Sequence, residues 1–276
     1  MRHVSVAAVQ MGMKEVEDFD GFKTHIRYLL DNCHEADLVV FPEYTGLELI
    51  TTYKDWRRLP VSNWAAALEP FSTDFEALFA TEAKMRGQVI TASTIYMDTD
   101  LNAKNRTYLF HQDGIYEVHD KTRLIHREQK WGAIPGDEME MFPVRFANIG
   151  INVCYEVEFP ECARQLVEQD TEILIVPSAT FSLRGLNRVR QCARTRAIEN
   201  QMYVVNACLS DQTETLGTAA LSGIYSPVDL GFSQDGIVAA LTLDGETVLI
   251  ERLDMELLQD IRQSSSANTY KDYIGD

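Results

Sequence analysis

Short apolar runs alternate with amphipathic stretches along the whole of this 276-residue chain. Short runs rich in β-branched residues predict strands, and longer segments with apolar residues three or four positions apart predict helices. Strands that alternate with helices are typical of α/β folds, in which helices cover the faces of a sheet. Because no repeat, linker or low-complexity segment interrupts the pattern, we expect a single domain over residues 1–262.

The individual elements follow from the same pattern. The predicted strands are His3–Gln10, Leu38–Phe41, Gln88–Met97, Asn105–His111, Ile115–His119, Ile149–Val153, Ile173–Pro177, Met202–Cys208, Gly223–Ser226, Ile237–Leu243 and Glu246–Arg252. The predicted helices are Phe19–Cys33, Thr73–Arg86, Pro160–Glu168, Leu186–Asn200 and Met255–Arg262. Strand–helix units followed by hairpins favour a layered α/β sandwich. The polar segment 263–276 is expected to be an exposed tail.

The charge balance argues against several classes of function. The 42 acidic residues outnumber the 25 basic ones, which gives a net charge of −17. Such a chain repels phosphate backbones and anionic lipid, so we expect neither nucleic-acid nor membrane binding. No stretch reaches the roughly 18 consecutive apolar residues of a transmembrane helix. The N-terminus lacks the long apolar run and cleavage site of a signal peptide, so no leader is expected.

The cysteines point to a reducing compartment. They are odd in number, irregularly spaced and without a CxxC pair: Cys33, Cys154, Cys162, Cys192 and Cys208. This distribution argues against a disulfide framework and against a structural zinc site. We therefore expect a cytoplasmic protein.

Three predicted strands end abruptly at a reactive side chain. Apolar runs lead into Glu43 and Cys154, and the strand before Lys121 ends in the same way. In open α/β folds, ligands bind beyond the carboxyl ends of the strands, where these three side chains would lie. A cysteine thiolate is a strong nucleophile, a carboxylate can take its proton, and a lysine can stabilise a developing negative oxygen. Taken singly, the three residues could equally be a packed core thiol, a turn cap and a solvated surface lysine.

The surrounding sequence resembles the nitrilase superfamily of carbon–nitrogen hydrolases. Five blocks carry the resemblance, in the order and at the distances found in that family. They are VVFPEYTG (Val39–Gly46), VHDKTRLIHRE (Val118–Glu128), INVCYEVEFPECARQL (Ile151–Leu166), ILIVPSAT (Ile173–Thr180) and RTRAIENQMYVVNA (Arg194–Ala207). With the opening VAAVQM and the closing LDMELLQDIR, the resemblance covers nearly the whole chain.

This resemblance implies a fold and a catalytic mechanism. The fold is a four-layer α-β-β-α sandwich, and the mechanism is cysteine-dependent hydrolysis through a thioester, without a metal or an organic cofactor. Glu43 would be the general base, Lys121 the stabiliser of the oxyanion and Cys154 the nucleophile. Glu128 is the best match to a second glutamate that orients the lysine, and the backbone N–H of Tyr155 is the expected second oxyanion donor.

Two acidic residues near the cysteine bear on the choice of substrate. Glu156 either supports the site or contacts the substrate. Glu158 stands where several carboxylate-handling relatives have an arginine, so an unpaired carboxylate there would disfavour acidic substrates and favour neutral or cationic amides. A surface location for Glu158 is the alternative.

Four aromatic residues near the motifs are candidates for the substrate cleft: Tyr44, Trp131, Tyr155 and Phe181. Each could equally be ordinary core. The segment 51–64 is expected to form a loop near the entrance, or an irregular surface connection.

These features predict an amidase that cleaves a small linear amide or an N-carbamoyl amine and releases ammonia or an amine. Tyr155 after the cysteine, where many nitrilases have tryptophan, and the end of the chain at residue 276 favour an amidase over a nitrilase acting on nitriles. The other alternative is a catalytically silent scaffold that binds partners. The resemblance also implies a homodimer or larger homo-oligomer, formed through the helices near Pro160–Glu168 and Leu186–Asn200.

Overall fold

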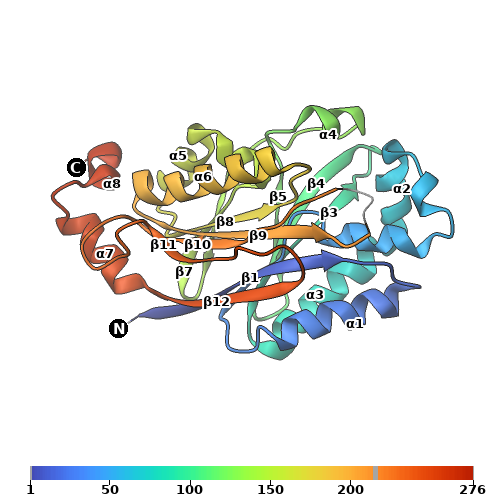
Figure 1. Ribbon diagram of the computed structural model, residues 1–276, viewed down its shortest axis with the longest axis horizontal. Helices are drawn as coiled ribbons and strands as arrows, with labels where there is room; N and C mark the ends of the chain where they lie inside the picture. The colour runs from blue at the N-terminus through green and yellow to red at the C-terminus, as the bar shows by residue number, and fades with distance from the viewer. Residues whose placement is uncertain (1, 214–216, 276) are drawn as a thin grey trace.

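Two β-sheets packed face to face form the centre of the computed structural model, which describes residues 2–213 and 217–275 (Figure 1). The first sheet has the order β5-β4-β3-β2-β1-β12, formed by β1 (His3–Met13), β2 (Leu38–Val40), β3 (Val89–Met97), β4 (Ala103–Phe110), β5 (Tyr116–Asp120) and β12 (Thr247–Asp254). The second has the order β6-β7-β8-β9-β10-β11, formed by β6 (Met141–Val144), β7 (Ala147–Ile151), β8 (Ile173–Ser178), β9 (Tyr203–Asp211), β10 (Gly223–Tyr225) and β11 (Ile237–Ala240). The sheets join where the ends of β1 and β9 pair in parallel.

Helices cover the outer faces of both sheets. Figure 1 shows α1 (Phe19–Asp31) and α3 (Ser72–Arg86) on one side, and α5 (Pro160–Val167) and α6 (Leu183–Asn200) on the other. The shorter helices are α2 (Trp64–Leu68), α4 (His126–Lys130), α7 (Met255–Ser264) and α8 (Thr269–Ile274). The predicted four-layer α-β-β-α sandwich is thereby confirmed. None of the helices in the described part of the chain combines the length and apolar character that a membrane crossing requires.

Strand β1 illustrates how the sequence specifies these layers. Successive side chains of a strand point to opposite faces. Val4, Val6 and Ala8 belong to the core that includes β7 to β9, whereas Ala7 and Val9 belong to the core that includes α1 and α3. Because both faces are buried, the strand is an almost continuous apolar run rather than an alternating one.

Three regions of the domain differ from the predicted elements, the first being α4, where no helix was predicted. Strand β6 was not expected, because it is only four residues long and contains Pro143. A strand tolerates proline mainly at the edge of a sheet, and β6 is an edge strand. The predicted entrance loop instead forms short 3-10 helices, η1 (Thr45–Thr52), η2 (Trp56–Arg58) and η3 (Val61–Asn63), followed by α2. The Trp64 ring at the start of α2 lies 5.3 Å from the ring of Trp131.

The C-terminal segment folds back onto the domain. Most of its side chains are exposed, as expected, but it forms α8 instead of extending away from the body. The Tyr270 hydroxyl donates to Asp170 at 2.9 Å, and the Tyr273 hydroxyl donates to Glu168 at 2.7 Å. Asp276, the last residue of the predicted tail, lies outside the described residues.

Candidate active site

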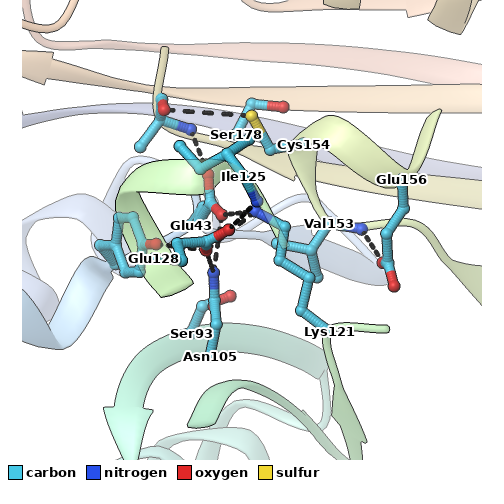
Figure 2. A network of polar contacts seen from close by, with 12 residues as sticks. Glu43, Ser93, Asn105, Lys121, Ile125, Glu128, Val153, Cys154, Glu156 and Ser178 are labelled. Carbon is cyan, nitrogen blue, oxygen red and sulfur yellow. Dashed lines mark hydrogen bonds and ion pairs between the residues drawn. The ribbon is translucent and has the colours of Figure 1, made fainter. Parts of the chain in front are cut away.

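Glu43, Lys121 and Cys154 meet at one edge of the sandwich (Figure 2). They follow β2, β5 and β7, whose carboxyl ends all lie at this edge. The ammonium of Lys121 donates to Glu43 Oε1 at 2.7 Å. Ala179, directly after β8, links the other two residues, because its N–H donates to Glu43 Oε2 at 2.8 Å and its carbonyl oxygen lies 3.9 Å from Cys154 Sγ.

The backbone turns sharply at two of these strand ends. Cys154 has a φ of 48° and Tyr44, next to Glu43, has a φ of 63°, both in the left-handed region that side-chain-bearing residues rarely adopt. Each such conformation costs on the order of 1–3 kcal/mol and persists only where the surrounding packing enforces it. Both residues are buried, so packing fixes the turn that presents the thiol to the carboxylate.

A closed set of hydrogen bonds holds two carboxylates side by side. Lys121 Nζ donates to Glu43 Oε1 at 2.7 Å and to Glu128 Oε1 at 3.0 Å. On the other side, Asn105 Nδ2 lies 2.7 Å from each of the same two oxygens. The four side chains are at most 3% exposed. The ammonium of Lys121 and the neutral amide of Asn105 therefore each bridge the buried acidic groups of Glu43 and Glu128.

The charges in this set determine its protonation. Burial raises the pKa of Glu43, and Lys121 offsets this only in part while Glu128 adds to it. Burial alone would lower the pKa of Lys121, but the charges of Glu43 and Glu128 raise it overall. Lys121 therefore stays an ammonium in contact with both acidic groups.

The Cys154 thiol is not acidic in this environment. Burial raises its pKa well above the ordinary value, and the charge of Glu43 raises it further, against the opposing effect of Lys121. Lys121 lowers the pKa of the thiol, but by less than burial and Glu43 raise it. The proton must leave Sγ during the attack on a substrate, which requires a base beside it.

Glu128 is held from two directions. The Tyr44 hydroxyl donates to Glu128 Oε1 at 2.6 Å, and the Ile125 N–H donates to Oε2 at 2.8 Å. The Tyr44 ring lies 5.7 Å from that of Trp131. A cavity of about 10 Å³, space for one water at most, is lined by residues that include Tyr44, Asn105, Glu128 and Trp131.

Glu156 does not face this set of residues. Figure 2 shows its side chain turned toward the backbone of Val153. Its carboxylate accepts hydrogen bonds from the N–H groups of Val153 and Thr122, each at 2.6 Å, and pairs with His119 Nε2 at 2.9 Å. Of the two predicted roles, the structure favours support over substrate contact, because no oxygen of Glu156 is left for a substrate. It ties the end of β5 to the cysteine turn.

Glu158 is paired rather than free. Its carboxylate accepts a hydrogen bond from Arg188 Nε on α6 at 2.9 Å. The premise that it places an unpaired carboxylate beside the substrate is therefore wrong, and the charge argument against acidic substrates loses its basis.

The remaining aromatic candidates have partners of their own. The Tyr155 ring packs edge-on against Phe159, with 4.9 Å between the centroids. Phe181 lies beneath the guanidinium of Arg127, at 4.3 Å. Neither lines the cavity that Tyr44 and Trp131 share.

Sequence reasoning missed Asn105, Ala179 and His119. Asn105 left a signal, because it is a polar residue at a buried position of its strand, as is Thr107 two residues further on. Within the described residues, no group of three or more His, Cys, Asp or Glu side chains is arranged to hold a metal ion. A nucleophile, a base and a cation are the components of acyl transfer.

Comparison with known proteins identifies the family. A family model for carbon–nitrogen hydrolases matches residues 5–263. The probable hydrolase YhcX of Bacillus subtilis is 32% identical over 98% of this chain and 53% of its own length, so the chain spans about half of that relative. The ω-amidase NIT2-A of Xenopus laevis is 26% identical over 83% of this chain and 80% of its own.

Solved structures share the fold. Nit3 of Saccharomyces cerevisiae, a member of branch 10 of the nitrilase superfamily, superposes with a TM-score of 0.76 at 21% identity, covering 96% of this chain and 95% of that one. A double mutant of an amidase from Nesterenkonia sp. AN1, in complex with acrylamide, gives a TM-score of 0.74 at 19% identity, covering 94% of each chain.

Proposed function

The chain belongs to the carbon–nitrogen hydrolase family, and we propose that it is an amidase that hydrolyses the C–N bond of a small linear amide. One observation carries the proposal: Cys154 is buried beside Glu43 and Lys121 at the edge where the strands end. The names of several relatives, ω-amidase and 2-oxoglutaramate amidase, favour an amide over a nitrile as substrate.

In the first half of the proposed reaction, Glu43 takes the proton of Cys154 as Sγ bonds to the amide carbon. The carbonyl electron pair moves onto oxygen, and the ammonium of Lys121 and the backbone N–H of Tyr155 stabilise the resulting oxyanion. Glu43 then passes the proton to the nitrogen, the C–N bond breaks, and ammonia or an amine leaves. The acyl group remains on Cys154 as a thioester.

In the second half, Glu43 takes a proton from water while the water oxygen attacks the thioester carbon. The C–S bond then breaks, the proton returns to Sγ, and a carboxylic acid is released. The raised pKa of Glu43 suits a group that must accept and return a proton twice in each cycle. Glu128 has a positioning role, because it contacts Lys121 and is itself fixed by Tyr44.

The test is a panel of amides, N-carbamoyl amines and nitriles, with ammonia release and mass spectrometry of the protein as readouts. Hydrolysis of amides, with an acyl adduct on the wild type that is absent from Cys154→Ala, is the expected result. Glu43→Gln should lose turnover while remaining folded. Turnover of nitriles alone would indicate a nitrilase, and absence of both turnover and adduct would indicate a silent scaffold.

We also propose a cytoplasmic location. All five cysteines are unpaired, which suits a compartment that keeps thiols reduced. The proposed chemistry supports the same conclusion, because oxidation of Cys154 would remove the nucleophile.

A further inference from the structure

Arg127, the residue before Glu128 on α4, lies over two aromatic rings beside the catalytic residues. Its guanidinium carbon is 4.3 Å from the ring centre of Phe181 and 5.8 Å from that of Trp131. Phe181 is two residues from Ala179, which contacts both Glu43 and Cys154. Trp131 packs against Tyr44, which holds Glu128. Both rings are therefore held close to Glu43, Lys121, Glu128 and Cys154, which we call the catalytic set.

The Arg127 side chain is also unpaired. It makes no hydrogen bond or ion pair within residues 2–213 and 217–275, although the chain carries 42 acidic residues against 25 basic ones. Several other cations near the site are paired with protein carboxylates. Lys121 contacts Glu43 and Glu128, Lys104 and Arg106 contact Asp120, and Arg188 contacts Glu158. Within the described residues, Arg127 has no carboxylate partner, and neither does Arg123, which lies over the Phe159 ring.

The stacking prepares the guanidinium for a particular kind of ligand. A guanidinium held over an aromatic ring keeps the N–H groups at its edge free, and that edge matches the two oxygens of a carboxylate. Arg127 is half-buried, so part of its side chain remains open to a ligand.

The catalytic set contains a single cation. Lys121 contacts both Glu43 and Glu128, and all three side chains are buried. A second cation near these residues would attract an anionic substrate and fix the end of it that does not react.

We propose that Arg127, stacked on Phe181 and Trp131, binds a carboxylate at the end of the substrate opposite the scissile amide. The preferred substrate is then a short linear amide with a terminal carboxylate. This inference rests on the proposed amidase function and makes Arg127 the residue that determines specificity.

The experiment compares succinamate with levulinamide, in which a neutral methyl ketone replaces the carboxylate. Wild type should prefer succinamate. Arg127→Gln should lower kcat/KM for succinamate by about 10- to 100-fold, mainly through KM, as expected for loss of a charge-assisted pair. It should change levulinamide by no more than about 2-fold, and Arg127→Lys should recover only part of the loss.

Lys130→Gln is the matched control, because it removes one positive charge from an exposed position of the same helix and should leave both substrates unchanged. An equal effect of Arg127→Gln on both amides, or none on either, would overturn the inference.

Calorimetry of succinamate with Cys154→Ala and with the Cys154→Ala/Arg127→Gln double variant tests Arg127 without turnover. If wild type hydrolyses no amide, the proposed function fails, and this binding measurement still decides the role of Arg127.

Discussion

Asn105 shows how one neutral side chain can organise two acidic ones. Its amide donates to Glu43 and Glu128 on the side opposite Lys121. A second cation there would hold both carboxylates ionised and weaken Glu43 as a base. A neutral donor fixes their positions with a smaller effect on their protonation.

Replacing this amide should change the pH dependence of the reaction. The hydrogen bond from Asn105 lowers the pKa of Glu43, so Asn105→Leu should raise that pKa and move the acid limb of the kcat/KM profile to higher pH. We also expect kcat to fall about 10- to 100-fold, because the base is less well positioned. Ser93→Ala, which breaks the buried pair with Thr107, is the control and should leave the limb in place. An unmoved limb in Asn105→Leu would contradict the role of the amide.

The thiol of Cys154 gives a second prediction at this scale. The negative charge of Glu43 raises the Cys154 pKa and Lys121 lowers it, so Glu43→Gln should lower that pKa although turnover is lost. Ultraviolet titration of the thiolate, with Cys154→Ala as the baseline, measures the shift. A Cys154 pKa that stays the same or rises in Glu43→Gln would show that this charge does not control the thiol.

At the scale of elements, the buried pair of His119 and Glu156 joins the end of β5 to the cysteine turn. Burial alone would lower the pKa of His119, but the charge of Glu156 raises it above the usual 6.5. Burial alone would raise the pKa of Glu156, but His119 and hydrogen bonds from Thr122 and Val153 lower it. Each partner therefore favours the charged form of the other, and the pair helps to fix the spacing between Lys121 and Cys154.

This pair should make stability depend on pH in a defined direction. A histidine whose pKa is higher in the folded state stabilises fully below pH 6.5 and loses that contribution as pH rises through the folded-state pKa. The free energy of unfolding of wild type should therefore fall between pH 6.5 and alkaline pH by more than that of His119→Asn. Urea titrations across this range test it, with His34→Asn at an exposed position as control. Equal slopes for wild type and His119→Asn would exclude the effect.

Close packing fixes the end of β5 from a second side. A Cβ at Gly136 would lie 2.1 Å from the backbone oxygen of Asp120, and the Gly136 N–H donates to the carbonyl of Lys121 at 2.9 Å. Gly136→Ala should therefore displace Lys121, lower kcat and cost about 1–3 kcal/mol of stability. Gly185→Ala on α6, where the nearest atom is 3.4 Å away, is the control. Unchanged kcat and melting temperature in Gly136→Ala would show that the end of β5 accommodates the added methyl group without displacing Lys121.

The same elements show which features could be predicted from sequence. Strands β1 and β2 were predictable because they are buried on both faces, which leaves long apolar runs. The convergence of Glu43, Lys121 and Cys154 was predictable because parallel strands end at one edge. The partners of Asn105, in contrast, depend on the register of β4 beside β5, which no local pattern encodes.

The two acidic residues after the cysteine show which features could not be predicted from sequence. Closeness to Cys154 in sequence left support or substrate contact open for Glu156, and substrate contact or a surface position open for Glu158. The 3-10 turn directs Glu156 away from the catalytic set, and Arg188, 30 residues further on, pairs with Glu158. The direction of a side chain on a tight turn and its distant partners decide such roles, and neither follows from spacing.

At the scale of the whole molecule, the outer layer formed by α5 and α6 bears on assembly. These helices lie side by side on the second sheet (Figure 1). One face of α6 is open from Leu183 to Ile198, which are 69% and 37% exposed. We propose that two chains form a homodimer by packing this layer against its copy, because burial of such side chains stabilises association.

Light scattering during size-exclusion chromatography should therefore give twice the mass of one chain. Ile198→Glu adds a carboxylate to the exposed face of α6, so it should shift the protein toward monomer at low micromolar concentration. Met85→Glu is the matched control, because Met85 is 73% exposed on α3, in the opposite outer layer. Since the chain carries a charge of −17, two copies repel, and raising the salt concentration should strengthen the dimer. A monomeric wild type would contradict the proposed dimer. Dissociation by Met85→Glu but not by Ile198→Glu would place the contact on the other outer layer.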